Sequence, residues 1–193
     1  DRGTMEIRPV EELRKLRLNE RKAESLTVQV GNNLTLRDIA GDSLELKLEA
    51  DCPKGAQFHV LVRCSPNGEE QTRITYDDIQ GVIRIDTTQS SLRKDIFQPF
   101  PYPQAAYFPK EIRQSKDIRI QEAPFKLLPN ETLKLTIFLD HSMLEVFAND
   151  RQCVTQRIYP SRADSRLIRL SSTGDNVKLH TLRAWDMAPA NPY

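Results

Sequence analysis

Residues 133–159 read LKLTIFLDHSMLEVFANDRQCVTQRIY, the longest run of strand signals in the chain. Leucine or isoleucine occupies every second position from Leu133 to Leu139, which is the period of a strand with one buried face. Asp140-His141-Ser142 breaks this pattern, and Leu144 and Val146 resume it. Short polar side chains that hydrogen-bond nearby backbone groups favour turns. The stretch therefore predicts a hairpin with its turn at residues 140–142.

A second turn and a third strand follow the hairpin. Asn149-Asp150 has the residue types of a turn, Cys153–Thr155 and Ile158–Tyr159 again favour extended structure, and Pro160 stops the strand. We expect three consecutive antiparallel strands, against which the other segments pack.

This central stretch also carries a resemblance to a known family. The run IFLDHSMLEVFANDRQCVTQRIYP at 137–160 resembles the signature near the end of glycoside hydrolase family 32, the invertase, levanase and inulinase group. Two further runs support it: RPVEELRKLR at 8–17, which resembles the segment leading from that family's catalytic domain into its C-terminal domain, and FHVLVRCSPNGEEQTRITYD at 58–77. The resemblance implies a C-terminal, concanavalin-like β-sandwich of a β-fructosidase that cleaves sucrose or fructans, and not its catalytic part.

The rest of the chain independently favours an all-β fold. Turn signals recur at short intervals between alternating apolar runs, and 12 Pro and 7 Gly suit strands joined by turns. This rhythm is typical of a two-sheet antiparallel β-sandwich. The further predicted strands are 26–30, 34–36, 43–49, 58–62, 72–76, 82–86, 166–170 and 177–185.

Two segments depart from the strand rhythm. Pro9, Val10, Leu13 and Leu16 predict a short amphipathic helix, so we assign residues 1–24 to a linker with a short helix, following a catalytic propeller that this chain lacks, and 25–193 to the sandwich. Residues 92–116 hold four prolines and five aromatic residues and predict a long loop. Its aromatic side chains either pack on the sandwich or meet another surface.

Composition excludes several classes of partner. The 28 Lys and Arg nearly cancel 27 Asp and Glu, so no net field favours nucleic acid or an anionic membrane. No apolar stretch approaches the ~20 residues of a membrane helix. The first residues, DRGTMEIRP, do not form a signal peptide, but a parent protein could be secreted or periplasmic, so we assign no compartment.

The three cysteines do not suit a full disulfide framework. Cys52, Cys64 and Cys153 are odd in number and have neither CxxC nor metal-ligand spacing. A single pair between Cys52 and Cys64 stays open, although three reduced thiols are the simpler expectation.

The sequence carries no recognisable catalytic pair. Retaining glycosidases need two carboxylates roughly 5 Å apart, and family 32 supplies its acidic residues from propeller motifs of the N-D-P-N, R-D-P and E-C types, none of which occurs here. Asp140 and Glu145 are the pair that a hairpin could bring to one edge. We expect Asp140 to serve the turn and Glu145 to face solvent or an interface, opposite Leu144 and Val146. No catalytic, cofactor-binding or metal-binding residue is therefore assigned.

The histidines, Ser142 and Trp185 are the remaining candidates for a site. His59, His141 and His180 lack short metal-ligand spacing and are expected at the surface or in turns, and neighbouring His141 and Ser142 cannot readily converge into a Ser-His-Asp arrangement. Trp185, the one tryptophan, favours core or interface packing over sugar stacking, because a single aromatic ring without convergent polar groups rarely makes a sugar site.

Two functional hypotheses follow. The preferred one is a non-catalytic module that packs on the catalytic propeller of the same polypeptide and stabilises it, with shaping of substrate access or a homo-oligomer contact as further roles. The alternative is a lectin-like module that tethers the enzyme to fructan, with fructan or sucrose as its ligand. No cofactor is expected in either case.

Overall fold

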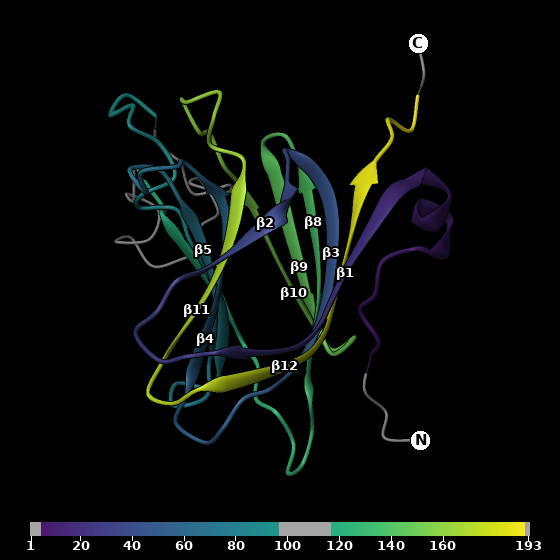
Figure 1. The fold of residues 1–193 in the computed structure, drawn as a ribbon, viewed down its shortest axis with the longest axis vertical. Coiled ribbons are helices and arrows are strands. Elements are labelled where there is room, and N and C mark those ends of the chain that lie inside the picture. Colours follow the sequence, from purple (N-terminus) through teal and green to yellow (C-terminus); the bar gives the residue numbers. More distant parts are fainter. Residues whose placement is uncertain (1–4, 97–116, 192–193) are drawn as a thin grey trace, which may run out of the picture.

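The computed structural model describes residues 5–96 and 117–191, and these form a sandwich of two antiparallel six-stranded sheets (Figure 1). The all-β prediction is confirmed. The first sheet has the order β1 (Arg17–Val28), β12 (Val177–Met187), β3 (Ser43–Asp51), β8 (Leu133–Asp140), β9 (Met143–Ala148) and β10 (Gln152–Arg157). The second has the order β2 (Leu34–Ala40), β11 (Leu167–Thr173), β4 (Gln57–Cys64), β5 (Thr72–Asp77), β6 (Val82–Asp86) and β7 (Ile120–Pro124).

The three central strands form where they were predicted, except that β10 ends at Arg157, before Ile158 and Tyr159. In β8 and β9, the alternating residues such as Ile137 and Leu144 are fully buried between the sheets, and Glu145 lies on the opposite face. The turn at Asn149-Asp150 has positive φ angles of 47° and 52° at its two residues. This is the mirror-image turn whose twist matches that of the strands it joins, and Asn and Asp tolerate it well. The local sequence therefore favours the turn between β9 and β10.

The core lies between the inner faces of the two sheets. Leu44, Leu46 and Leu48 of β3 and Phe58 and Val60 of β4 belong to it, each at most 1% exposed. Alternation along β3 leaves its other face to Glu45, Lys47 and Glu49, as the pleat requires. The apolar pattern thus sets which side of each sheet faces inward.

The N-terminal segment lies outside the first sheet. The predicted short helix is present as one 3₁₀ helix, η1 (Glu11–Leu16), at the right edge of the view beyond β1 (Figure 1). Strand β1 begins directly after it, at Arg17, so the domain boundary predicted after residue 24 falls inside β1 and stays a prediction. Most of the predicted aromatic loop, residues 97–116, lies outside the described residues.

The thiols are free and no spanning helix is found. Cys52, Cys64 and Cys153 form no disulfide, and burial raises the pKa of Cys52 to about 12 and that of Cys64 to about 11. Within residues 5–96 and 117–191, no helix has the length and apolar character needed to cross a membrane.

Candidate functional site

The carboxylates of the central hairpin do not form a catalytic pair. Asp140 pairs with Met143 and Glu145 with Phe138, so Asp140 and Glu145 are diagonal neighbours on the outer face of the sheet. A retaining glycosidase holds its two carboxylates in a shared, water-excluding site, whereas this face of the hairpin is open to solvent. The side chain of Asp140 is 75% exposed, so nothing excludes water from it. That Asp140 and Glu145 have no catalytic role stays a prediction.

The histidines are dispersed over the molecule. His141 is exposed in the β8–β9 turn, and His180 of β12 lies 2.7 Å from Asp51 Oδ2. His59 is buried, contrary to the expectation of a surface position: its Nδ1 lies 2.9 Å from Thr75 Oγ1, and burial lowers its pKa to about 4. No cluster of potential metal ligands occurs among residues 5–96 and 117–191.

The Ser142 hydroxyl is bonded to an arginine rather than to a base. Its hydroxyl accepts a hydrogen bond of 2.8 Å from Arg157 Nη1, while the adjacent His141 extends to solvent. A nucleophile needs a base within hydrogen-bond reach, so no Ser-His-Asp arrangement forms at this turn.

A pocket of about 710 Å³ opens beside the same turn, at one end of the sandwich. Its volume falls within the roughly 300–1,000 Å³ of small-molecule sites. Two other hollows, of about 650 and 740 Å³, are comparable in size, so volume alone does not single it out. The residues that line it and matter below are Asp42, Arg63, His141, Tyr159 and Ser161.

Arg63 is the buried cation of this pocket. It is 8% exposed, its Nε donates to Ser165 O at 2.8 Å, and its Nη1 donates to His141 O at 3.4 Å. The carboxylate of Asp42 lies 3.9 Å from Nη1. Burial lowers the pKa of Arg63, and the Asp42 carboxylate opposes that shift. Backbone carbonyls and one distant carboxylate thus hold the guanidinium group.

A β-bulge directs Arg63 into this position. Strand β4 advances from Leu61 to Cys64 where its partner β11 advances only from Arg169 to Leu167, so β4 holds one extra residue. Arg63 has a φ of 51°, a left-handed conformation that is uncommon for residues other than glycine. Bulges change the direction of a side chain and occur often beside functional sites. The bulge and the left-handed backbone of Arg63 together place a buried guanidinium at the pocket, which makes the pocket a candidate site.

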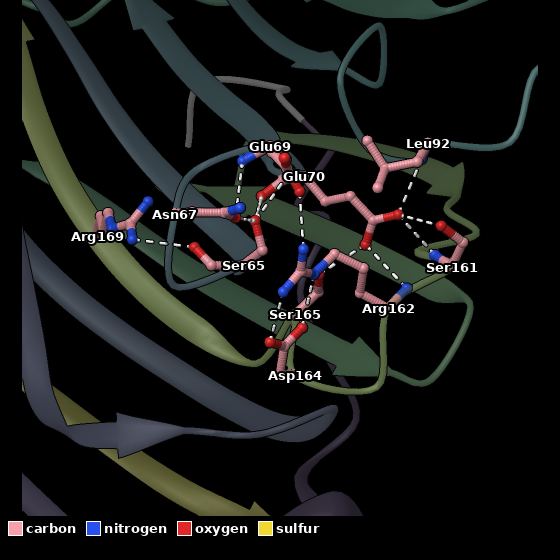
Figure 2. Close-up of polar contacts among 10 residues, drawn as sticks. All are labelled: Ser65, Asn67, Glu69, Glu70, Leu92, Ser161, Arg162, Asp164, Ser165 and Arg169. Carbon is pink, nitrogen blue, oxygen red and sulfur yellow. Dashed lines mark hydrogen bonds and ion pairs between the residues drawn. The ribbon is translucent and has the colours of Figure 1, made fainter.

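Glu70 holds the wall of the pocket in place (Figure 2). It is fully buried, and its Oε1 accepts hydrogen bonds from the Leu92 amide at 2.9 Å and from the amide and hydroxyl of Ser161. Its Oε2 accepts from the Arg162 amide at 3.1 Å and the Ser165 hydroxyl at 2.6 Å. One carboxylate thereby joins the β4–β5 loop, the segment after β6 and the β10–β11 connection.

The environment keeps Glu70 ionised. Burial by itself raises the pKa of Glu70, but the hydrogen bonds from the Ser161 and Ser165 hydroxyls and the Leu92 and Ser161 amides outweigh it and lower the pKa to about 2. A carboxylate whose two oxygens already accept five hydrogen bonds has no free acceptor for a substrate proton. Glu70 therefore positions other groups and does no acid–base chemistry.

Ser165 connects Glu70 to Arg63. Its carbonyl oxygen accepts from Arg63 Nε, and its hydroxyl donates to Glu70 Oε2. Ser165 itself is fully buried. Opposite charges are thus linked through a neutral residue, and the pocket wall is organised before any ligand arrives.

The outer face of the first sheet carries a second polar arrangement. Arg17 donates two hydrogen bonds of 2.6 Å to the buried carboxylate of Glu45, and its guanidinium lies 4.2 Å from the ring centroid of Trp185. Arg183 covers the same ring at 4.9 Å. Trp185 is 5% exposed, which agrees with the expected packing role and leaves no ring face for a sugar.

The segment before β1 continues along this face. The Ile7 amide donates to Asp150 O at 2.8 Å, and the Ala188 amide donates to Leu16 O at 2.8 Å. The segment presents Met5, 77% exposed, and Val10, 64% exposed, to solvent. Its path is thus fixed by the sandwich, while its apolar side chains are uncovered.

The model of one protein family, described as the C-terminal domain of glycosyl hydrolases family 32, matches residues 12–186. The chain belongs to this family.

Relatives of this family 32 C-terminal domain include a levanase from Bacillus subtilis, 31% identical over 94% of this chain and 25% of that protein. A vacuolar acid β-fructofuranosidase from a Rosa hybrid cultivar is 25% identical over 94% of this chain and 31% of its own length. The domain therefore spans a quarter to a third of these relatives.

Solved structures show the same fold. Fructan 1-exohydrolase IIa from Cichorium intybus superimposes with a TM-score of 0.75 at 21% identity, over 95% of this chain and 38% of that one. Sucrose-6-phosphate hydrolase from Lactobacillus gasseri gives a TM-score of 0.65 over 97% of this chain and 32% of that one. The resemblance predicted from the motifs is confirmed.

The pocket of this family 32 C-terminal domain was not predicted from sequence. A charged residue, Arg63, near the end of the otherwise mostly apolar run of β4 was the available signal. Glu70 carries no such signal, because it lies among polar loop residues. Its role depends on Ser161 and Ser165, some ninety positions along the chain.

Proposed function

We propose that this chain is a non-catalytic C-terminal module of a β-fructosidase acting on sucrose or fructans, and that it packs on the catalytic propeller of the same polypeptide and stabilises it. The observation that carries the proposal is the segment from Ile7 to Arg17, which lies along the outer face of the first sheet. In the sequence, this segment resembles the one that joins the two domains of family 32 enzymes. The module thus presents a preformed surface at the place where a joined domain would begin.

The chemistry of that surface supports packing. Exposed Met5 and Val10 supply apolar area, and the Arg17–Glu45 pair together with Trp185 gives a rigid base. Contacts between domains of one chain bury roughly 600–1,500 Å². Because the segment is already ordered on the sandwich, little conformational entropy is lost on contact.

The test is titration calorimetry between this chain and a separately produced propeller of the same protein, with the melting temperature of the propeller as a second measurement. We expect saturable heat and a raised propeller melting temperature. Val10→Glu should weaken binding, because it places a charge on the contact surface. Ile79→Glu is the matched control, since Ile79 is 72% exposed in the β5–β6 turn of the other sheet.

Two outcomes would count against the proposal. Absence of heat with the propeller, beside saturable heat with fructan oligosaccharides, would favour the fructan tether. Equal weakening by Val10→Glu and Ile79→Glu would mean that the segment before β1 is not the contact surface. Light scattering of the chain alone tests the further proposal of a contact between two copies.

A further inference from the structure

We propose that the pocket containing Arg63 is a binding site for a neutral polyhydroxy compound, with a single sugar ring that carries adjacent hydroxyl groups as its ligand unit. The site is separate from the segment before β1 and needs no propeller.

The first support is the donor that Arg63 presents. Its Nε and Nη1 are used by Ser165 O and His141 O, and no hydrogen bond reaches its Nη2 from the part of the chain that the structure describes. Nη2 is not among the buried polar atoms that lack a partner, so it is open to solvent in the pocket. Nη2 carries two N–H donors, which can bond to hydroxyl oxygen atoms of a ligand.

The second support is the rigidity of the wall. Glu70 accepts hydrogen bonds from Ser161, which lines the pocket, and from Ser165 (Figure 2). Ser165 in turn accepts a hydrogen bond from Arg63. A site whose polar groups are held by buried hydrogen bonds loses little entropy when a ligand binds. A buried, fully bonded carboxylate placed behind a pocket has this effect without contacting the ligand.

The third support is the charge balance, which favours an uncharged ligand. Arg93 is paired with Asp95, with Nε 3.0 Å from Oδ1. Asp42 lies 3.3 Å from Arg166 Nη2 and 3.9 Å from Arg63 Nη1. The lining itself holds two arginines and two aspartates, and Arg166 adds a further guanidinium beside Asp42. An anionic ligand would have to approach the Asp42 and Asp95 carboxylates as well as the arginines, whereas hydroxyl groups can bond to both.

The fourth support is an aromatic ring at the rim. Tyr159 is 40% exposed and lines the same pocket. An exposed aromatic ring gives the C–H face of a sugar an apolar surface, while Asp42 accepts from its hydroxyls and Arg63 donates to them. Small-molecule sites orient their ligands with a small number of precisely placed polar groups beside an apolar surface.

The chain provides its own reporter for a test. Of its three histidines, His141 lines the pocket, His180 lies on β12 and His59 is buried on β4. We would follow the imidazole signals by NMR while adding sucrose or a fructose trisaccharide, with inorganic phosphate as a separate arm. The expected result is a saturable shift of His141 with the sugars, no shift of His180 or His59, and no response to phosphate at equal concentration.

Variants complete the test. Tyr159→Ala and Arg63→Gln should each weaken sugar binding at least about tenfold, which is roughly 1.4 kcal/mol. Lys134→Ala is the control, because Lys134 lines the hollow on the outer face of the first sheet. Circular dichroism checks that each variant is folded, and if Arg63→Gln unfolds, the exposed Tyr159 decides. A shift with phosphate alone, no His141 shift with either sugar, or equal weakening by Lys134→Ala would overturn the proposal.

This result is independent of the packing proposal. The titration uses the chain alone, so a failure to bind sugar leaves the calorimetry with the propeller unaffected. Conversely, a sandwich that does not bind a propeller would still show the His141 shift.

Discussion

Two buried carboxylates of this molecule are held by different kinds of hydrogen-bond donor. Glu45, 1% exposed, receives two hydrogen bonds from the guanidinium of Arg17. Glu70, fully buried, receives only neutral donors, three of them backbone amides. Because three of these donors are backbone amides, Glu70 fixes the path of the main chain in the β4–β5 loop, in the segment after β6 and in the β10–β11 connection. Glu45 instead secures one side chain over the outer face of the sheet.

Replacing Glu70 should cost more stability than its loop position suggests. Glu70→Gln keeps the size of the side chain but replaces one acceptor oxygen by an amide donor, so at least two of the donors around it lose their partner. Leaving buried donors of a charged group unsatisfied costs about 3 kcal/mol. Urea unfolding followed by circular dichroism measures the change. Glu69→Gln is the matched control and should cost under about 1 kcal/mol, because Glu69 forms a half-exposed ion pair with Arg162.

The same residue predicts a pH dependence. The pKa of Glu70 falls from its ordinary 4.5 to about 2 on folding, so the stability it contributes is fully present above pH 4.5 and is lost as the pH falls toward 2. The difference in urea midpoint between wild type and Glu70→Gln should therefore be constant from pH 7 to 5 and shrink between pH 4.5 and 2. A difference that grew on acidification would mean that the carboxyl group is protonated in the folded protein.

At the scale of elements, the alternation along β8 and β9 decides which side chains the fold tolerates. Leu144→Asp or Ile137→Asp would bury an unpaired charge at a position with no exposure. Such a charge costs several kcal/mol, comparable with the ~5–15 kcal/mol that stabilises a whole domain. We expect both variants to be unfolded by circular dichroism and thermal melting. Glu145→Ala should melt close to wild type, and the reverse ranking would place the register one residue off.

The strands that were predicted correctly are those in which apolar residues recur at every second position. Strand β3 alternates strictly, β4, β8 and β9 carry an apolar residue at every second position, and all four were placed from sequence. Strand β7, IQEAP, was not predicted, because it has no alternating apolar pattern. It forms through backbone pairing with β6. The charged start of β1 likewise becomes a strand only because β12 lies beside it, so β1 begins at Arg17 rather than near Leu26.

The candidate pocket was beyond prediction for a related reason. Asp42, Arg63, His141, Tyr159 and Ser161 come from four separate loops or strand ends. Sequence spacing says nothing about such a convergence, and the bulge that turns Arg63 appears only in the pairing of β4 with β11.

For the whole molecule, we expect no release of fructose from sucrose, levan or inulin by this chain alone. The acidic motifs are lacking from its sequence, and Asp140, 75% exposed, lies where nothing excludes water. A reducing-sugar assay measures this. Turnover above the blank that disappears in Asp140→Asn or Glu145→Gln would reinstate that pair as a catalytic one.

The strand order also bears on how the protein is made. Strand β11 lies between β2 and β4, and β12 lies between β1 and β3, so the two latest strands occupy interior places, one in each sheet. Until residues from Leu167 onward leave the ribosome, β1 and β2 have no neighbour, and β3 and β4 each expose an unpaired edge. Unpaired edges recruit other chains. The growing polypeptide therefore passes through a stage in which neither sheet is continuous, and this stage is where chaperones would act on it.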